Sequence, residues 1–153
     1  MKFQSKLCIA IALGLSAGCA GRPSLLPNTD ENLRKTSTQF AADAAKRHPY
    51  KADAPRGGDA EATVQYNPTF ARFDILNYST SDWHDVELWI NQNYVVFIPL
   101  LQKNKERVES LPFQMLFDES GNYFTTDGGK NPVKNVEIYR DGKMYTVPFK
   151  MEE

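Results

Sequence analysis

The chain has 153 residues, which leaves room for one domain of ordinary size and little more. A formal net charge of −1 is too balanced to favour a surface that binds a polyanion, so nucleic acid is excluded as an expected partner. No stretch is long and apolar enough to predict a retained membrane helix.

The N-terminal residues have the pattern of a secretory signal. Lys2 and Lys6 give a positive start, residues 7–15 form a short apolar run, and small residues follow at 16–18. The apolar run is shorter than a membrane-spanning helix, and a small-residue exit is typical of a cleaved signal. The sequence therefore predicts export from the cytoplasm.

The end of this signal is more specific. The run Leu-Ser-Ala-Gly-Cys at 15–19 resembles the lipobox of bacterial lipoproteins, with Ser16 where a large aliphatic residue is usual. The resemblance implies that residues 1–18 are removed, that Cys19 carries diacylglycerol, and that its new amino terminus is acylated. The alternative is ordinary cleavage after Ala20. Asp following the Cys would resemble an inner-membrane retention signal, so Ala20 favours the outer membrane, facing the periplasm.

Processing also bears on cysteine chemistry. Cys8 lies within the signal and Cys19 would be consumed by lipid, and these are the two cysteines of the chain. A mature protein of this kind has no free thiol, which excludes disulfides, Cys-based catalysis and Cys-ligated metal.

Residues 19–61 are predicted to be a tether that carries the lipidated Cys. Rich in Ala, Pro, Gly and charge, this region holds only Phe40 and Tyr50 as aromatics, too little apolar surface to offset the entropy of ordering. One helix is expected within it, capped by Thr29 and stopped at Pro49. This helix is either a weakly ordered spacer or a docking element for a partner.

From residue 62 to 150 the pattern changes to the two-residue period of β-strands. The Asp-Gly pair at 141–142 predicts a tight hairpin turn, and Pro112 restricts its strand to a sheet edge. Strands do not alternate with helices in this region, so a parallel sheet is not expected. About seven short antiparallel strands are expected, at 63–66, 70–77, 85–91, 94–98, 108–113, 136–139 and 144–147, with Phe73, Phe97 and Phe113 in the core.

The strand layout permits a comparison. Asn77 ends a strand, Trp83 precedes the alternating run at 86–91, and a turn-centred segment follows at 117–124. In these features the chain resembles the small immunoglobulin- or fibronectin-type-III-like sandwich domains of bacterial envelope proteins. The resemblance implies an all-β, antiparallel sandwich that binds, spaces or braces, and it supplies no shared catalytic residues.

Candidate chemical sites are few. Asp82, His84 and Asp85 could contribute to a metal site, but a metal normally needs further convergent ligands, so a solvated turn is the simpler interpretation. The acidic segment 118–122 lacks the Gly and Glu that an EF-hand loop requires at its sixth and twelfth places. With no catalytic sequence motif present, we expect no enzyme activity, no cofactor and no metal.

Trp89 is the most informative aromatic residue. It alternates out of phase with its apolar neighbours, so it should lie with Glu87 on the sheet face away from the core. If exposed beside Tyr94 or Tyr78, it could stack on a sugar ring or a partner surface. Alternatively a second layer covers it, such as the helix that carries Phe40.

Taken together, the sequence predicts a lipid-anchored cell-envelope protein with a non-catalytic interaction or structural module. Its expected partners are the membrane, through lipid on Cys19, and another envelope protein. The alternative is a periplasmic domain that binds a small ligand or carbohydrate through Trp89, Tyr94 and Tyr78.

Overall fold

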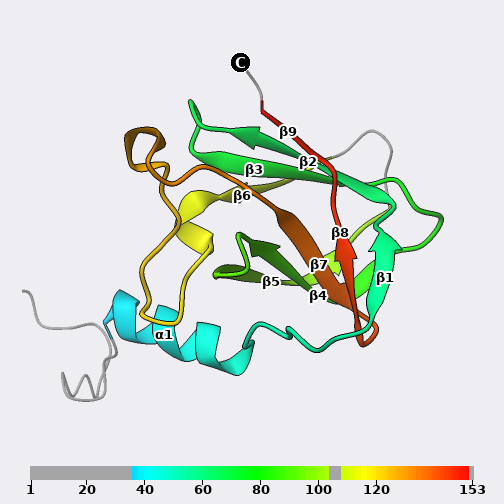
Figure 1. Cartoon of the computed structure of the whole chain (residues 1–153), viewed down its shortest axis with the longest axis horizontal. Helices are drawn as coiled ribbons and strands as arrows, with labels where there is room; N and C mark the ends of the chain where they lie inside the picture. Colours follow the sequence, from blue (N-terminus) through cyan, green and yellow to red (C-terminus); the bar gives the residue numbers. More distant parts are fainter. Residues whose placement is uncertain (1–35, 104–107, 152–153) are drawn as a thin grey trace, which may run out of the picture. The chain divides into compact units, whose positions relative to one another are not determined.

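A computed structural model describes residues 36–103 and 108–151 of the chain. The predicted signal 1–18, the lipid site Cys19 and the proposed helix cap Thr29 lie outside the described residues. The described part is mostly β-strand, with one α-helix among the elements it contains (Figure 1). It belongs to a compact unit that spans Lys35–Glu153, referred to below as the folded unit.

The strands form two sheets. The five-stranded sheet has the order β1-β8-β7-β4-β5, and the four-stranded sheet has the order β6-β3-β2-β9. The elements are α1 (Ser37–Arg47), β1 (Arg56–Asp59), β2 (Ala62–Asn67), β3 (Arg72–Asn77), β4 (Trp83–Ile90), β5 (Tyr94–Leu101), β6 (Glu109–Pro112), η2 (Phe113–Met115), η3 (Asp127–Gly129), β7 (Val136–Arg140), β8 (Lys143–Thr146) and β9 (Phe149–Met151).

Each of the seven predicted strands has its counterpart in β2 to β8, whereas β1 and β9 were not predicted. Both hairpins are confirmed: β4 pairs with β5, and β7 pairs with β8 through a turn in which Asp141 and Gly142 have φ of 49° and 75°. The strand that ends at Pro112 is an edge strand, as its proline required.

The expectation of purely antiparallel pairing is wrong at two places. β1 runs parallel to β8, and β2 runs parallel to β9. The reason is that two chain segments cross between the sheets side by side, one leading from β1 into β2 and the other from β8 into β9. Hydrogen bonds from Ala60 N to Thr146 O and from Val64 N to Pro148 O join them on either side of the crossing.

The two sheets share one hydrophobic core, built from alternate residues of β2, β3, β4, β5 and β7. Phe73 and Phe113 are buried in it, as predicted, and their ring centroids lie 5.0 Å apart. Phe97 is not in the core, because it lies opposite Glu87 on the outer face while its neighbours Val96 and Ile98 face inward. The unbroken apolar run of β5 conceals this alternation.

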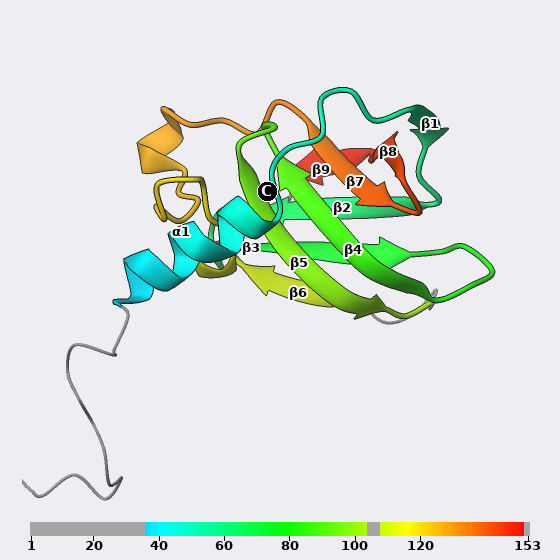
Figure 2. The same cartoon turned by 90° about the horizontal axis from the view of Figure 1, so that it is seen from below.

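Residues 36–59, predicted as part of a tether, belong to the folded unit. The helix begins after Thr36, which caps it in a reciprocal capping box with Gln39, and ends at Arg47 just before Pro49. Ala41 and Ala45 are buried, and α1 lies beside β5 on the outer face of the five-stranded sheet (Figure 2). The prediction of a helix in this region is therefore confirmed, but the helix is docked rather than a loose spacer.

The turn at 118–122 packs on the start of this helix. Asp118 stabilises the turn, because its Oδ1 accepts hydrogen bonds from the backbone N–H groups of Ser120 and Asn122. Gly121 has φ of 81°, and a Cβ there would lie 2.3 Å from Thr38 O in α1. Only glycine satisfies both the backbone angle and the close approach.

Candidate functional site

The segment His48–Arg56, which we call the strap, continues from α1 over the outer face of the five-stranded sheet. Two of its side chains reach a buried carboxylate on β4: His48 Nδ1 lies 2.8 Å from Glu87 Oε1, and Lys51 Nζ donates to Glu87 Oε2 at 2.5 Å. Trp89 Nε1 donates to the same Oε2 at 3.3 Å. Both oxygens of this carboxylate are therefore engaged within the protein.

A second buried carboxylate, Glu137 on β7, is held in the same way. Tyr50 donates its hydroxyl hydrogen to Oε2 at 2.8 Å, and Arg56 Nη1 donates to Oε1 at 2.5 Å. A buried carboxylate without partners would be costly, so the sheet and the strap depend on each other. We call this arrangement the clamp, because each oxygen of Glu87 and Glu137 has at least one hydrogen-bond partner in the strap.

The structure does not bring the three predicted binding residues together. Trp89 is 3% exposed and lies in a cluster with Ala45, Val95 and Met144, with Tyr50 packed edge-on at 5.1 Å. The covered alternative is thus the one found, and Trp89 is not exposed for stacking on a sugar ring. The layer consists of Ala45 on the helix and Tyr50 on the strap.

The other two tyrosines lie elsewhere. Tyr94 is partly buried against the core between the sheets, where its ring meets Phe124 edge-on at 5.3 Å. Tyr78 is exposed just beyond the end of β3. Neither tyrosine belongs to the cluster around Trp89. The predicted lipid site, Cys19, lies outside the described residues.

The metal candidates also separate in the structure. Asp82 Oδ1 accepts a hydrogen bond from the backbone N–H of Lys103, while His84 and Asp85 are exposed at the start of β4. Across residues 36–103 and 108–151, no three His, Cys, Asp or Glu side chains gather where they could hold a metal ion.

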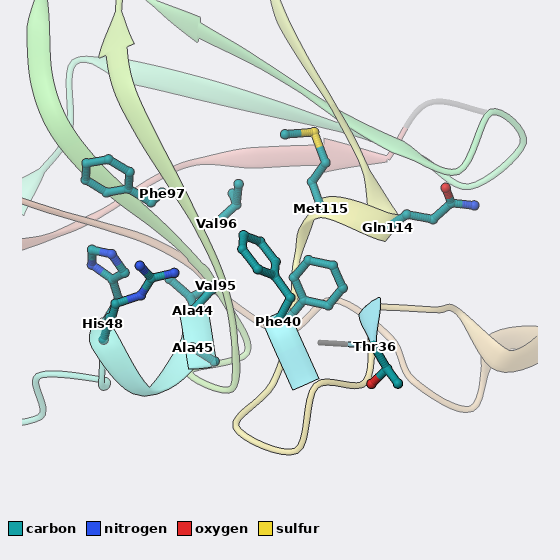
Figure 3. A pocket seen from close by; sticks show the side chains of 12 residues that line it. Thr36, Phe40, Ala44, Ala45, His48, Val95, Val96, Phe97, Gln114 and Met115 are labelled. Carbon is teal, nitrogen blue, oxygen red and sulfur yellow. The ribbon is translucent and has the colours of Figure 1, made fainter. Parts of the chain in front are cut away.

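The strongest candidate site is an open groove of about 740 Å³ between α1, β5 and the segment 114–117. Figure 3 shows Phe40 of α1, Phe97 of β5 and Met115 of η2 around this space. These three apolar side chains are 62%, 39% and 48% exposed. We call this feature the apolar groove. Such a concentration of exposed apolar side chains is uncommon on a soluble surface unless it binds something.

The helix makes the groove through two neighbouring stripes of residues. Ala41 and Ala45 form the buried stripe, and their small side chains let α1 lie close to β5. Phe40 and Ala44 form the next stripe, one position back, and line the groove. Sequence reasoning missed the groove because Phe40 was placed in a tether and Phe97 in the core, although the four-residue spacing of these alanines was the available signal.

The charge of the groove is one-sided. Arg47 and His48 are among its lining residues, and no Asp or Glu is. Arg47 is exposed, whereas His48 Nδ1 is engaged by Glu87 and the His48 ring stacks on Phe97 at 4.9 Å. A ligand in the groove therefore meets an apolar surface with a cationic end.

Comparisons with protein-family models, with curated proteins and with solved structures found no match to this chain. Within the described residues, the structure contains no helix with the length and hydropathy needed to span a membrane. The functional argument therefore depends on the geometry of the folded unit and on the sequence of its N-terminal region.

The strap predicts a specific response to alkaline pH. Burial, and then the hydrogen bond to Glu137, raise the pKa of Tyr50 above its ordinary value. Above about pH 10 the unfolded chain loses this phenolic proton while the folded protein keeps it, so the free energy of unfolding falls as pH rises. Tyr50→Phe should make this fall less steep in urea titrations between about pH 9 and pH 11.

The matched control is Tyr78→Phe, since Tyr78 is exposed and makes no part of the clamp. Burial also raises the pKa of Tyr66, so a residual alkaline slope should survive in Tyr50→Phe. Equal slopes for Tyr50→Phe and the wild type would contradict the described environment of Tyr50.

Proposed function

We propose that this protein is a lipid-anchored component of the cell envelope whose folded unit binds another protein and catalyses no reaction. The observation that carries the proposal is the apolar groove, in which Phe40 of the docked helix, Phe97 of β5 and Met115 of η2 are exposed together. A protein segment with apolar side chains would bury this surface, and burial of apolar area is the main favourable term in protein association. The lipobox-like run ending at Cys19 supports attachment to the membrane, with the outer membrane facing the periplasm as the favoured location.

The two sheets and their shared core support an interpretation as a sandwich domain used as a binding scaffold. The parallel pairs β1–β8 and β2–β9 depart from the antiparallel immunoglobulin-like layout that the sequence resembles. In this proposal the sheets provide a rigid floor, and α1 with the strap provides the wall that shapes the groove.

The proposed ligand is a protein rather than a sugar. A sugar site needs polar side chains beside the stacking ring to bind the hydroxyl groups. Polar groups in the lining are supplied by Thr36, Arg47, His48 and Gln114. Around Phe40, however, the exposed surface is apolar and includes Ala44 and Met115. This lining favours apolar side chains of a protein partner.

The test is photo-crosslinking in cells that express the full chain. A benzophenone-bearing phenylalanine analogue replaces Phe40, and in a second strain it replaces Met151, which lies on the edge strand β9 of the other sheet. The two positions are matched in exposure, at 62% and 64%. We expect a discrete protein adduct from position 40 and none from position 151, and Met115→Asp should abolish the adduct.

Equal adducts from both positions, or an adduct that tolerates Met115→Asp, would show that the groove is not the interface. Adducts to lipid or glycan alone would overturn the assignment to a protein partner. A Cys19→Ser arm tests the anchor, since loss of acyl mass and of membrane fractionation is expected. Unchanged mass and location, or a soluble wild type cut after Ala20, would remove the anchor from the proposal.

A further inference from the structure

The floor of the apolar groove is the edge of a β-sheet. β5 is the terminal strand of the five-stranded sheet, with β4 on one side. On its other side Val95 N donates to Phe117 O at 3.0 Å, and Phe117 N donates to Val95 O at 3.1 Å. This single antiparallel bridge shows that the outward edge of β5 accepts a strand-like partner, and that the backbone polar groups of Val95 point away from β4.

The next outward-facing position on this edge is Phe97. In an antiparallel ladder the residues that bond one neighbour alternate with those that bond the other. Trp89–Val95 and Glu87–Phe97 are opposed pairs two residues apart in the same ladder, so Phe97 also directs its N–H and C=O away from β4. Within the described part of the chain, no turn or loop backbone hydrogen bond reaches these two groups.

The groove follows this edge. Its lining includes Val95, Val96 and Phe97 in succession, and Phe117 is also among the lining residues. Figure 3 shows Phe40 on the helix side of β5 and Met115 on η2. An extended chain laid beside Phe97 would continue the pairing that Phe117 begins, and alternate side chains would fall toward Phe40.

The charges that line the groove indicate which residue types the bound segment contains. The exposed guanidinium of Arg47 lies in a lining that contains no carboxylate. An acidic residue in the bound segment would therefore meet a complementary charge at Arg47.

We propose that the groove binds an extended segment of another protein by strand addition to β5. The segment pairs its backbone with the N–H and C=O of Phe97, places apolar side chains at alternate positions against Phe40, and directs an acidic residue toward Arg47. This inference rests on the proposed protein-binding function and specifies how the binding occurs.

The test is selection of octapeptides from a random displayed library on the immobilised full-length protein. Sequences with alternating apolar residues and an acidic residue should be enriched, and enrichment should disappear on the Phe40→Asp protein. The best peptide is then resynthesised with an N-methyl group at each peptide bond in turn. Strand addition predicts that methylation weakens binding by about tenfold at alternate bonds and has little effect at the bonds between them.

A protein-side comparison isolates the same hydrogen bond. Phe97→Ala and Phe97→Pro lose the same ring, but only Phe97→Pro loses the N–H that faces outward. Proline is tolerated on an edge strand, and Pro99 already occupies this one. We expect the best peptide to bind Phe97→Pro about tenfold more weakly than Phe97→Ala.

The possible failures are distinguishable. Enriched peptides with helical periodicity, or binding that is lost in Phe40→Asp but indifferent to N-methylation, would overturn strand addition while leaving the proposed function in place. No enrichment over the Phe40→Asp protein would overturn both. A wild type that is dimeric and becomes monomeric in Phe97→Pro would show that the segment comes from a second copy, which would overturn the assignment to a different protein. The N-methyl scan decides the question even if Phe97→Pro does not fold.

Discussion

Phe124→Ala is expected to lower the free energy of unfolding by about 3–5 kcal/mol, the range for truncating a fully buried phenylalanine. Phe124 is 0% exposed, and its ring centroid lies 4.9 Å from that of Phe113 and 5.3 Å from those of Phe73 and Tyr94. It belongs to the long connection before β7, outside any strand, and together with Leu116 it anchors this connection to the core. Urea denaturation of the full chain measures the effect as a shift in the midpoint with little change in slope.

The adjacent residue provides the control. Tyr123 is exposed, and Tyr123→Ala should change the free energy of unfolding by no more than about 0.5 kcal/mol. Comparable losses for the two variants would mean that the cluster of rings around Phe124 is not the core of the folded unit.

The strands of the core could be predicted because each carries its own evidence. The Val86-Leu88-Ile90 alternation defines a buried face, and the Asp141-Gly142 pair supplies the two positive φ angles that a tight hairpin needs. Such signals are local, so they require no knowledge of the rest of the fold. β1 and β9 lack them, since each is short and is held by a parallel neighbour that is distant in the sequence.

The outer layer could not be predicted, because alternation identifies a face but not what covers it. Glu87 and Glu137 have the spacing of solvent-facing charges, yet both are buried by the strap. Their partners Lys51 and Arg56 lie in a stretch whose composition is that of a linker. Complementary charges 36 and 81 residues apart become a clamp only once the helix has docked.

The apolar groove could not be predicted from the sequence for a related reason. Its walls come from three segments that share no sequence pattern, with Phe40 in the predicted tether, Phe97 in a continuous apolar run, and Met115 in a short 3₁₀ turn. The interaction module expected from the sequence stays a prediction. The expected binding residue Trp89 supports the site from beneath instead of lining it.

That supporting role leads to the second large effect. Trp89→Ala should destabilise the protein by about 3–5 kcal/mol, and the loss should be concentrated in α1 and the strap. Trp89 is the largest member of the cluster that holds Ala45 and Tyr50 on the sheet, and its Nε1 also donates to Glu87. Relative to the wild type, hydrogen exchange in Trp89→Ala should therefore accelerate more at the α1 amides than at the β7 and β8 amides.

Trp89→Phe is a milder change, since it keeps a ring against Tyr50 while removing the N–H donor to Glu87 and part of the indole. The expected cost is smaller than that of Trp89→Ala, because most of the packing remains and Lys51 and His48 still engage the carboxylate. If the groove needs a docked helix, Trp89→Ala should also abolish crosslinking from position 40, although Trp89 does not line the groove. Full protection of α1 in Trp89→Ala would contradict this account, because the helix would then be held to β5 by contacts other than those over Trp89.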